Sequence, residues 1–374
     1  MSRDMARAFA REKLAPKAAE WDRSHYFPRS ELREMGKLGF LGITVPEAWG
    51  GAGADALSMA AILEELAAGD AGVSTIVSGH NSVACMPIAQ FGTDEQKERF
   101  LRPLARGEWL GGFALTEAHG GSDAGAMGAK AIRQGDHYVL NGMKQFITTG
   151  KHADVIIAFA KTRPELGPKG ISAFIVPTTT AGYKVVRVEA KMGQHSSDTC
   201  QIAFENMVLP ADLLLGEEGQ GYRIALSNLE SGRIGIAAQA VGVARAAYEV
   251  AVQYAKERNV FGKAIIDHQA VGFRIARMAS RIEAARQLVH HAAALKDAGR
   301  ECLMEACMAK LEASEMAELV CSDTIQTLAG YGYLTDYPAE RLYRDARVTK
   351  IYEGTNDIQH LVILRELQKR AARG

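Results

Sequence analysis

A glutamate near the C-terminus is the first candidate for chemistry, in the run Ile351-Tyr-Glu-Gly-Thr-Asn-Asp-Ile-Gln359. Thr355 or Asn356 is a suitable N-cap for a final helix, which places Glu353 just before that helix. The adjacent Gly354 lets a ligand approach the backbone closely. A solvated glutamate in a helix-entry turn fits the same run and is the commoner setting for a lone glutamate.

A second stretch, Phe113-Ala-Leu-Thr-Glu-Ala-His-Gly-Gly-Ser-Asp123, runs from a β-like segment into small and hydroxyl residues. Backbone amides in such a turn can approach a planar, polar ligand and can also contact phosphate. Taken alone, the stretch favours an ordinary glycine turn between strands. Its chemistry depends on what lies beside it.

A third glycine pattern, Gly51-Ala-Gly-Ala-Asp-Ala56, fits the G-x-G-x-x-A form of a dinucleotide fingerprint. That fingerprint needs a strand, a tight turn, a helix and a second strand that ends in an acid. Pro46 and Trp49 separate the glycines from the strand-like residues 40–45, and Asp70 ends a helix instead. We interpret this pattern as a loop.

The elements that must position these residues follow an α, β, α order. Residues 55–68 carry apolar residues at helical spacing, and Thr93 with Gln96 has the spacing of a capping box. Short β-rich runs follow, with no helix-length segment between them, which disfavours a parallel sheet and is typical of a barrel or sandwich. The runs are residues 137–140, 145–149, 154–159, 171–176, 183–188 and 200–204.

The rest of the chain is helical again, because no proline occurs between Pro210 and Pro338 and the segments 221–258, 262–298 and 301–328 are alanine-rich and amphipathic. We predict an α+β multidomain protein. Its parts are an N-terminal α-helical domain at 1–112, a central antiparallel β-barrel at 113–217 and a C-terminal four-helix bundle at 218–374.

Composition excludes several classes of protein. The 374 residues include 44 basic and 44 acidic side chains, so charge gives no reason to expect a nucleic-acid partner. The longest apolar run, residues 234–243, is too short for a membrane span. Residues 2–13 mix acids and bases, unlike a signal or transit peptide, so we expect a cytoplasmic protein. The scattered five cysteines and the absence of H-E-x-x-H predict buried free thiols and no metal site.

Together, the stretches at 113–123 and 351–359 resemble the acyl-CoA dehydrogenase family. Thr116-Glu117 with Gly121-Ser-Asp123 resembles its first flavin-binding signature, and Tyr343-Arg-Asp-Ala-Arg347 with Ile351-Tyr-Glu-Gly-Thr355 resembles its second. The motifs at 257–262, 268–269 and 326–332 fall in family order between them. The resemblance covers nearly the whole chain, and it implies the same α, β, α fold.

The resemblance implies that Glu353 is the catalytic base, which takes the α-proton of an acyl-CoA thioester while the β-hydrogen leaves as hydride to FAD. It also implies a homotetramer, a dimer of dimers, in which part of each FAD site comes from a neighbouring subunit. The implied substrate contacts are Ser122, Glu230, Arg233 and Gly354. The implied FAD contacts are Leu115, Thr116, Gly121, Ser122, Phe146, Ile147, Thr148, Arg258, Phe261, Gln269, Gln326, Ala329, Gly330, Thr355, Asn356 and Asp357.

Some residues depart from the common family pattern. Phe146 stands where many members have Trp, Ala118 where many have Pro, and Ala329 where Gly is usual. The family's alternative base position, just before Arg233, is Gly232 here. Glu230 lies about 200° round a helix from that position and should point elsewhere. Glu353 is therefore the only good base.

We expect α,β-dehydrogenation of a short-chain acyl-CoA, linear or of the branched isobutyryl type, with electrons passed to electron-transfer flavoprotein. One rival is an acyl-CoA oxidase that uses oxygen; such chains usually carry a further C-terminal helical domain, for which we see no counterpart. The other rival is a non-enzymatic relative, which would be expected to lose the base or the flavin contacts.

Overall fold

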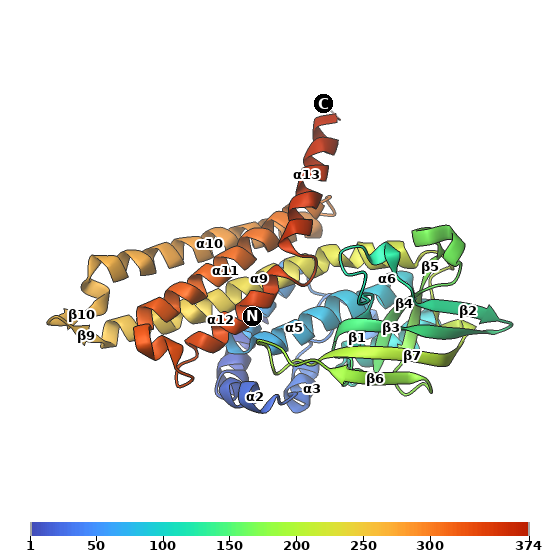
Figure 1. Cartoon of the computed structure of the whole chain (residues 1–374), viewed down its shortest axis with the longest axis horizontal. Coiled ribbons are helices and arrows are strands. Elements are labelled where there is room, and N and C mark those ends of the chain that lie inside the picture. The colour runs from blue at the N-terminus through green and yellow to red at the C-terminus, as the bar shows by residue number, and fades with distance from the viewer. Residues whose placement is uncertain (1, 373–374) are drawn as a thin grey trace.

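A computed structural model describes residues 2–372, apart from the side chains of residues 228 and 229. The molecule is elongated, with long C-terminal helices toward one end and the sheet at the other (Figure 1). Helices come first along the chain, then the sheet, then helices again, which confirms the predicted order.

Side chains cap the N-terminal helices where the sequence indicates. Asp55 accepts a hydrogen bond from the Ser58 N–H at 2.7 Å, and Thr93 and Gln96 form the predicted capping box. The helices are α1 (Ser2–Phe9), α2 (Ala18–Ser24), α3 (Arg29–Lys37), α4 (Ala56–Gly69), α5 (Ala71–Gly79), α6 (Met86–Phe91), α7 (Asp94–Gln96) and α8 (Arg102–Ala105).

The middle of the chain forms an eight-stranded sheet with the order β6-β7-β3-β2-β4-β5-β8, in which β1 also pairs with β4. The strands are β1 (Gly111–Ala114), β2 (Lys130–Gln134), β3 (His137–Thr148), β4 (Val155–Lys161), β5 (Ile171–Pro177), β6 (Tyr183–Val188), β7 (Thr199–Pro210) and β8 (Leu214–Leu215). The six predicted β-rich runs all lie on these strands or within one residue of them.

Two details of the predicted antiparallel barrel are wrong. The strand order ends at β6 and β8, and no pairing between described residues joins these ends into a barrel. In addition, β1 runs parallel to β4, and β2 meets β4 in a parallel pair. Parallel strands are usually connected by a helix, whereas here the β2–β3 hairpin connects β1 to β4.

The three long segments predicted to be helical are confirmed as α9 (Gly221–Glu257), α10 (Gln269–Asp297) and α11 (Leu303–Leu328). They lie side by side, and α12 (Ala339–Arg347) follows them. The last helix, α13 (Asn356–Ala372), projects away from the rest of the molecule (Figure 1). The short strands β9 (Asn259–Val260) and β10 (Lys263–Ala264) pair in the connection between α9 and α10.

Two buried cores hold these parts together. One is shared by the N-terminal and C-terminal helices, and the other lies between the sheet and helices α6 and α8. Helix α9 packs so closely on α4 that a Cβ at Gly242 would lie 2.2 Å from the Glu64 carbonyl oxygen. All five cysteines are buried and free, as predicted. The described helices include none that is long and apolar enough to cross a membrane.

Candidate active site

Glu353 lies in a tight turn that leads into α13. Its φ of 53° and the φ of 85° at Gly354 put two successive residues in the left-handed region, which glycine tolerates and glutamate does not favour. The Thr355 hydroxyl oxygen then accepts a hydrogen bond from the Ile358 N–H at 3.4 Å. The predicted placement of Glu353 just before a capped helix is therefore confirmed.

The Glu353 carboxylate rests against Gly232 of α9. A Cβ at position 232 would lie 2.7 Å from Glu353 Oε2, so the absence of a side chain there makes room for the carboxylate. Oε2 is buried and has no hydrogen-bond partner. Burial raises the pKa of Glu353 to about 7, although the positive charges of Arg233 and Lys310 act to lower it. Such a carboxylate is suited to accept a proton near neutral pH.

Three elements fix the turn that carries this carboxylate. The Tyr352 hydroxyl donates to Gln239 Oε1 on α9 at 2.6 Å. Gln359 of α13 donates through Nε2 to the carbonyl oxygens of Glu353, at 3.1 Å, and Gly354, at 2.8 Å. From α11, Lys310 Nζ donates to the Gly354 carbonyl oxygen at 2.8 Å. The backbone strain at Glu353 is thus held from three sides.

The predicted substrate residues on α9 face different ways. Arg233 is buried, and its Nε has no hydrogen-bond partner. Glu230 points away from Glu353, because its Oε1 accepts a hydrogen bond from Cys302 Sγ at 2.7 Å. The unpartnered guanidinium nitrogen is a donor available to a polar group of a ligand.

The predicted flavin contacts on the sheet come together at a β-bulge in β3. The register between β3 and β7 shifts between Lys144 and Ile147, and the Gln145 N–H donates instead to the Thr116 carbonyl oxygen at 2.8 Å. In this bulge, Phe146 has a φ of 59°, and 63% of its surface is exposed to solvent. The bulge therefore exposes Phe146 next to the residue that is bonded to the Thr116 backbone.

A buried ion pair, which the sequence reasoning missed, fixes this arrangement. Lys144 Nζ lies 2.8 Å from Glu117 Oε1 and also donates to the Leu115 carbonyl oxygen at 3.1 Å. Glu117 further accepts the Gly128 and Ala129 N–H groups at 2.6 and 3.0 Å. Burial acts to raise the pKa of Glu117, but Lys144 and the two backbone N–H donors together outweigh burial, and the pKa is lowered.

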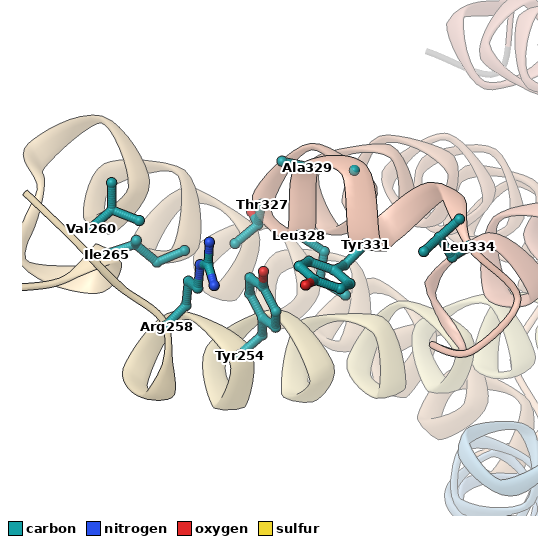
Figure 2. Close-up of a pocket in the computed structure, with 10 residues that line it drawn as sticks. Tyr254, Arg258, Val260, Ile265, Thr327, Leu328, Ala329, Tyr331 and Leu334 are labelled. Atoms are coloured by element: carbon teal, nitrogen blue, oxygen red, sulfur yellow. The ribbon is translucent and has the colours of Figure 1, made fainter.

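A cavity of about 520 Å³ at the far end of the bundle contains other predicted cofactor residues. Figure 2 shows Arg258 and Tyr254 rising from the end of α9 toward Tyr331. The guanidinium carbon of Arg258 lies 6.0 Å from the Tyr331 ring centre. The lining residues are Tyr254, Arg258, Val260, Ile265, Thr327, Leu328, Ala329, Gly330, Tyr331 and Leu334. Three other predicted cofactor residues do not line it: Phe261 in the β9–β10 connection, Gln269 at the start of α10 and Gln326 near the end of α11.

The predicted cofactor residues thus fall into separate groups. Gly232 and Arg258 are 26 positions apart along α9 and its end, roughly 39 Å at 1.5 Å per residue. This distance is longer than an extended dinucleotide cofactor. The Asn356 side chain is also turned inward, where it contacts Lys310 and Ser314 of α11.

Backbone strain occurs at several of the predicted site residues. Among the described residues, eight other than glycine have positive φ, and four of them are predicted site residues: Phe146, Phe261, Ala329 and Glu353. Strained residues persist where the surrounding structure holds them, and they cluster at functional sites. By contrast, a second cavity of about 340 Å³, between α4, α6, α9 and the end of α10, is lined by none of the predicted site residues.

The comparisons with known proteins agree with this architecture. Models of the N-terminal, middle and C-terminal domains of acyl-CoA dehydrogenase match residues 1–108, 112–207 and 219–368. The fold and the match together define an oxidoreductase of a flavoprotein class. The chain belongs to the acyl-CoA dehydrogenase family, which confirms the resemblance read from its motifs.

Similar proteins cover nearly the full chain. An acyl-CoA dehydrogenase of Bacillus subtilis is 50% identical over 98% of this chain and 97% of its own length. A short-chain specific acyl-CoA dehydrogenase of Clostridium acetobutylicum is 44% identical over 96% and 95%. A chain in the solved structure of the electron transferring flavoprotein of Acidaminococcus fermentans superposes with a TM-score of 0.97, is 46% identical, and covers 98% of this chain and 97% of that one.

Proposed function

We propose that this protein is an FAD-dependent short-chain acyl-CoA dehydrogenase in which Glu353 removes the α-proton of the substrate. The strongest support is the Glu353 carboxylate, whose Oε2 is buried and unpartnered over Gly232 and whose pKa is raised to about 7. A base with these properties takes a proton at neutral pH with little cost. The short acyl chain is supported by the similar short-chain specific enzyme.

Different residues of this chain have different roles at the thioester. Glu353 takes the α-proton onto its carboxylate. The N–H of Glu353 donates to the thioester oxygen, where negative charge develops as that proton leaves. Arg233, whose buried Nε has no partner, binds a polar atom of the substrate. FAD, when bound, supplies the acceptor for the hydride that leaves the β-carbon.

The flavin contacts proposed from one subunit are those gathered at the β3 bulge and the turns near it. Phe146 offers an exposed aromatic face to a planar ring, and the Thr116 segment beside it offers backbone groups. The residues proposed to hold the cofactor there are Leu115, Thr116, Gly121, Ser122, Phe146, Ile147 and Thr148, with Thr355 and Asp357 and the backbone of Asn356 near the base.

We propose that the Arg258 cavity serves the FAD of a neighbouring subunit in a homotetramer. This follows from the separation of roughly 39 Å along α9, which one cofactor cannot span. Exposed aromatic side chains around the cavity support an interface there, since Phe261 is 93% exposed and Tyr333 is 85% exposed. A charged guanidinium is also suited to bind pyrophosphate.

The proposed electron acceptor is an electron-transfer flavoprotein, supported by the similar chain in the Acidaminococcus fermentans structure. Oxygen is the rival acceptor and would make the protein an oxidase. A relative without enzymatic activity is disfavoured, because the base and the flavin-facing residues are all present.

The test is anaerobic reduction of the purified flavoprotein by butyryl-CoA, isobutyryl-CoA and octanoyl-CoA. We expect a yellow protein with about one FAD per chain, bleached fastest by a four-carbon substrate. Reoxidation by electron-transfer flavoprotein should be much faster than by air. A protein that takes up no FAD, or that none of the three acyl-CoAs bleaches, would contradict the proposal.

A further inference from the structure

Two lysines of the described part of the chain are completely buried, and they have different partners. Lys144 and Lys310 both have 0% exposed surface. Lys144 neutralises its charge against the Glu117 carboxylate at 2.8 Å. Lys310 donates to neutral oxygens, the Gly354 carbonyl at 2.8 Å and Asn356 Oδ1 at 2.9 Å, and forms no ion pair with a carboxylate of the described residues. An ammonium without a paired carboxylate is costly to bury.

Both oxygens that Lys310 contacts belong to the turn that carries Glu353. Gly354 follows Glu353 directly, and the backbone at both residues is left-handed. Asn356 is fixed in turn by Ser314, four residues along α11 from Lys310, through a hydrogen bond of 3.1 Å from its Nδ2 to the serine hydroxyl. Helix α11 therefore holds the turn at two points one helical turn apart.

We propose that Lys310 is a positioning residue for Glu353, which clamps the turn of the base and supplies a positive charge beside its carboxylate without contacting it. This inference rests on the proposed function of Glu353. It explains why a charged side chain stands in an otherwise apolar stretch of α11, between buried Ala309 and Leu311. A neutral side chain could fill the same space at lower cost.

The charge of Lys310 adds to a small set of groups near Glu353. Arg233 faces the carboxylate from α9, and Lys310 faces it from α11. Around Lys310 itself are also Cys307 of the same helix and Lys350, which precedes the turn. Burial lowers the pKa of Lys310 to about 8, while Glu353 acts to raise it. At neutral pH the Lys310 amine is therefore mostly protonated, and its positive charge favours the ionised form of Glu353.

Removal of the Lys310 charge makes the Glu353 anion less favourable, so the pKa of Glu353 rises further. The acid limb of the pH profile of kcat/KM then moves to higher pH. A shift of about one pH unit corresponds to an approximately tenfold lower kcat/KM below the limb.

The experiment uses three variants of the FAD-loaded protein with butyryl-CoA. Lys310→Gln keeps a donor but removes the charge, and Lys310→Met removes both. Ser314→Ala is the matched control, because it loosens Asn356 without a change of charge. We expect both Lys310 variants to shift the acid limb upward by about 0.5–1 pH unit. Ser314→Ala should keep the wild-type limb.

A second readout does not depend on turnover. The carboxylic-acid infrared band that Glu353→Gln abolishes reports protonation of Glu353, and its midpoint should rise in both Lys310 variants. An unchanged limb and an unchanged midpoint in folded Lys310→Gln would overturn the proposal. If Lys310→Met does not fold, Lys310→Gln decides. A wild-type protein that no acyl-CoA bleaches would instead contradict the proposed function, while the infrared midpoints still test the role of Lys310.

Discussion

The turn of Glu353 and the cavity of Arg258 are built in opposite ways. The turn is half-buried and is held by α9, α11 and α13 of its own chain. The cavity is open, with large aromatic side chains exposed around it. The proposed base is therefore held by residues of one chain, whereas the FAD site proposed at Arg258 requires a neighbouring subunit. On the proposed function, proton abstraction depends on residues of one subunit, and retention of FAD depends on the assembled oligomer.

Loss of the base should have the largest effect. Glu353→Gln keeps the size of the side chain but cannot accept a proton, so we expect kcat to fall about 10²–10⁴-fold. FAD content should stay at the wild-type level, because the amide preserves the packing over Gly232. Steady-state rates with butyryl-CoA and the flavin absorbance check both expectations. If Glu353→Gln loses FAD together with activity, the base and the cofactor site are not independent, which would contradict this prediction.

The same substitution should stabilise the protein at alkaline pH. The pKa of Glu353 is raised from 4.5 to about 7 on folding, so folding with the ionised carboxylate is penalised above pH 7. As the pH falls through 7 toward 4.5, the wild type takes up the proton and the penalty disappears. Glu353→Gln should therefore be more stable than wild type by about 2–3 kcal/mol at pH 8 and by little near pH 5. Calorimetric unfolding at the two pH values checks the sign.

In the other region, Arg258→Ala should weaken FAD retention by about 1.5–3 kcal/mol, because a charge-assisted donor is lost. The base is untouched, so kcat at saturating FAD should change little. FAD dissociation and the oligomeric state are measured by fluorescence and light scattering. Arg11→Ala, an exposed arginine near the N-terminus, is the control. If Arg258→Ala changes neither FAD affinity nor assembly, the cavity is not part of a shared site.

The smallest expected effect concerns strain at the cavity. Ala329 has φ 52° and ψ −129°, a conformation that favours glycine. Ala329→Gly should stabilise the protein by about 1 kcal/mol. Ala317→Gly, in the interior of α11, should instead lose stability by at least about 0.5–1 kcal/mol. Thermal unfolding of the two variants compares them, and a loss of stability in Ala329→Gly would contradict the strain argument.

Local signals predicted much of this structure. The capping residues Thr93 and Thr355, the long proline-free helices and the β-rich runs depend on neighbouring residues, and each was found in place. The parallel pairing of β1 with β4 was not predictable, because those strands are joined through a hairpin whose position depends on tertiary packing.

The site was predictable only in part. The turn of Glu353 follows from Gly354 and the helix cap, but the buried lysines do not follow from any local pattern. Lys144 bonds to Glu117, which is 27 residues away in the sequence. Lys310 bonds to Gly354, which is 44 residues away. In a sequence, a lysine between apolar residues of a helix or strand indicates a solvated edge. The inward turn of Asn356 depends on the same distant partner.

The central claim is that Glu353, and not Glu230, is the base. The direct measurement is anaerobic bleaching of the flavin by butyryl-CoA, followed in wild type, Glu353→Gln and Glu230→Gln by rapid mixing. We expect fast bleaching in wild type and a rate that is lower by about 10²-fold or more in Glu353→Gln. The change in Glu230→Gln should be much smaller, because its carboxylate is turned toward Cys302. Normal bleaching in Glu353→Gln with none in Glu230→Gln would contradict it.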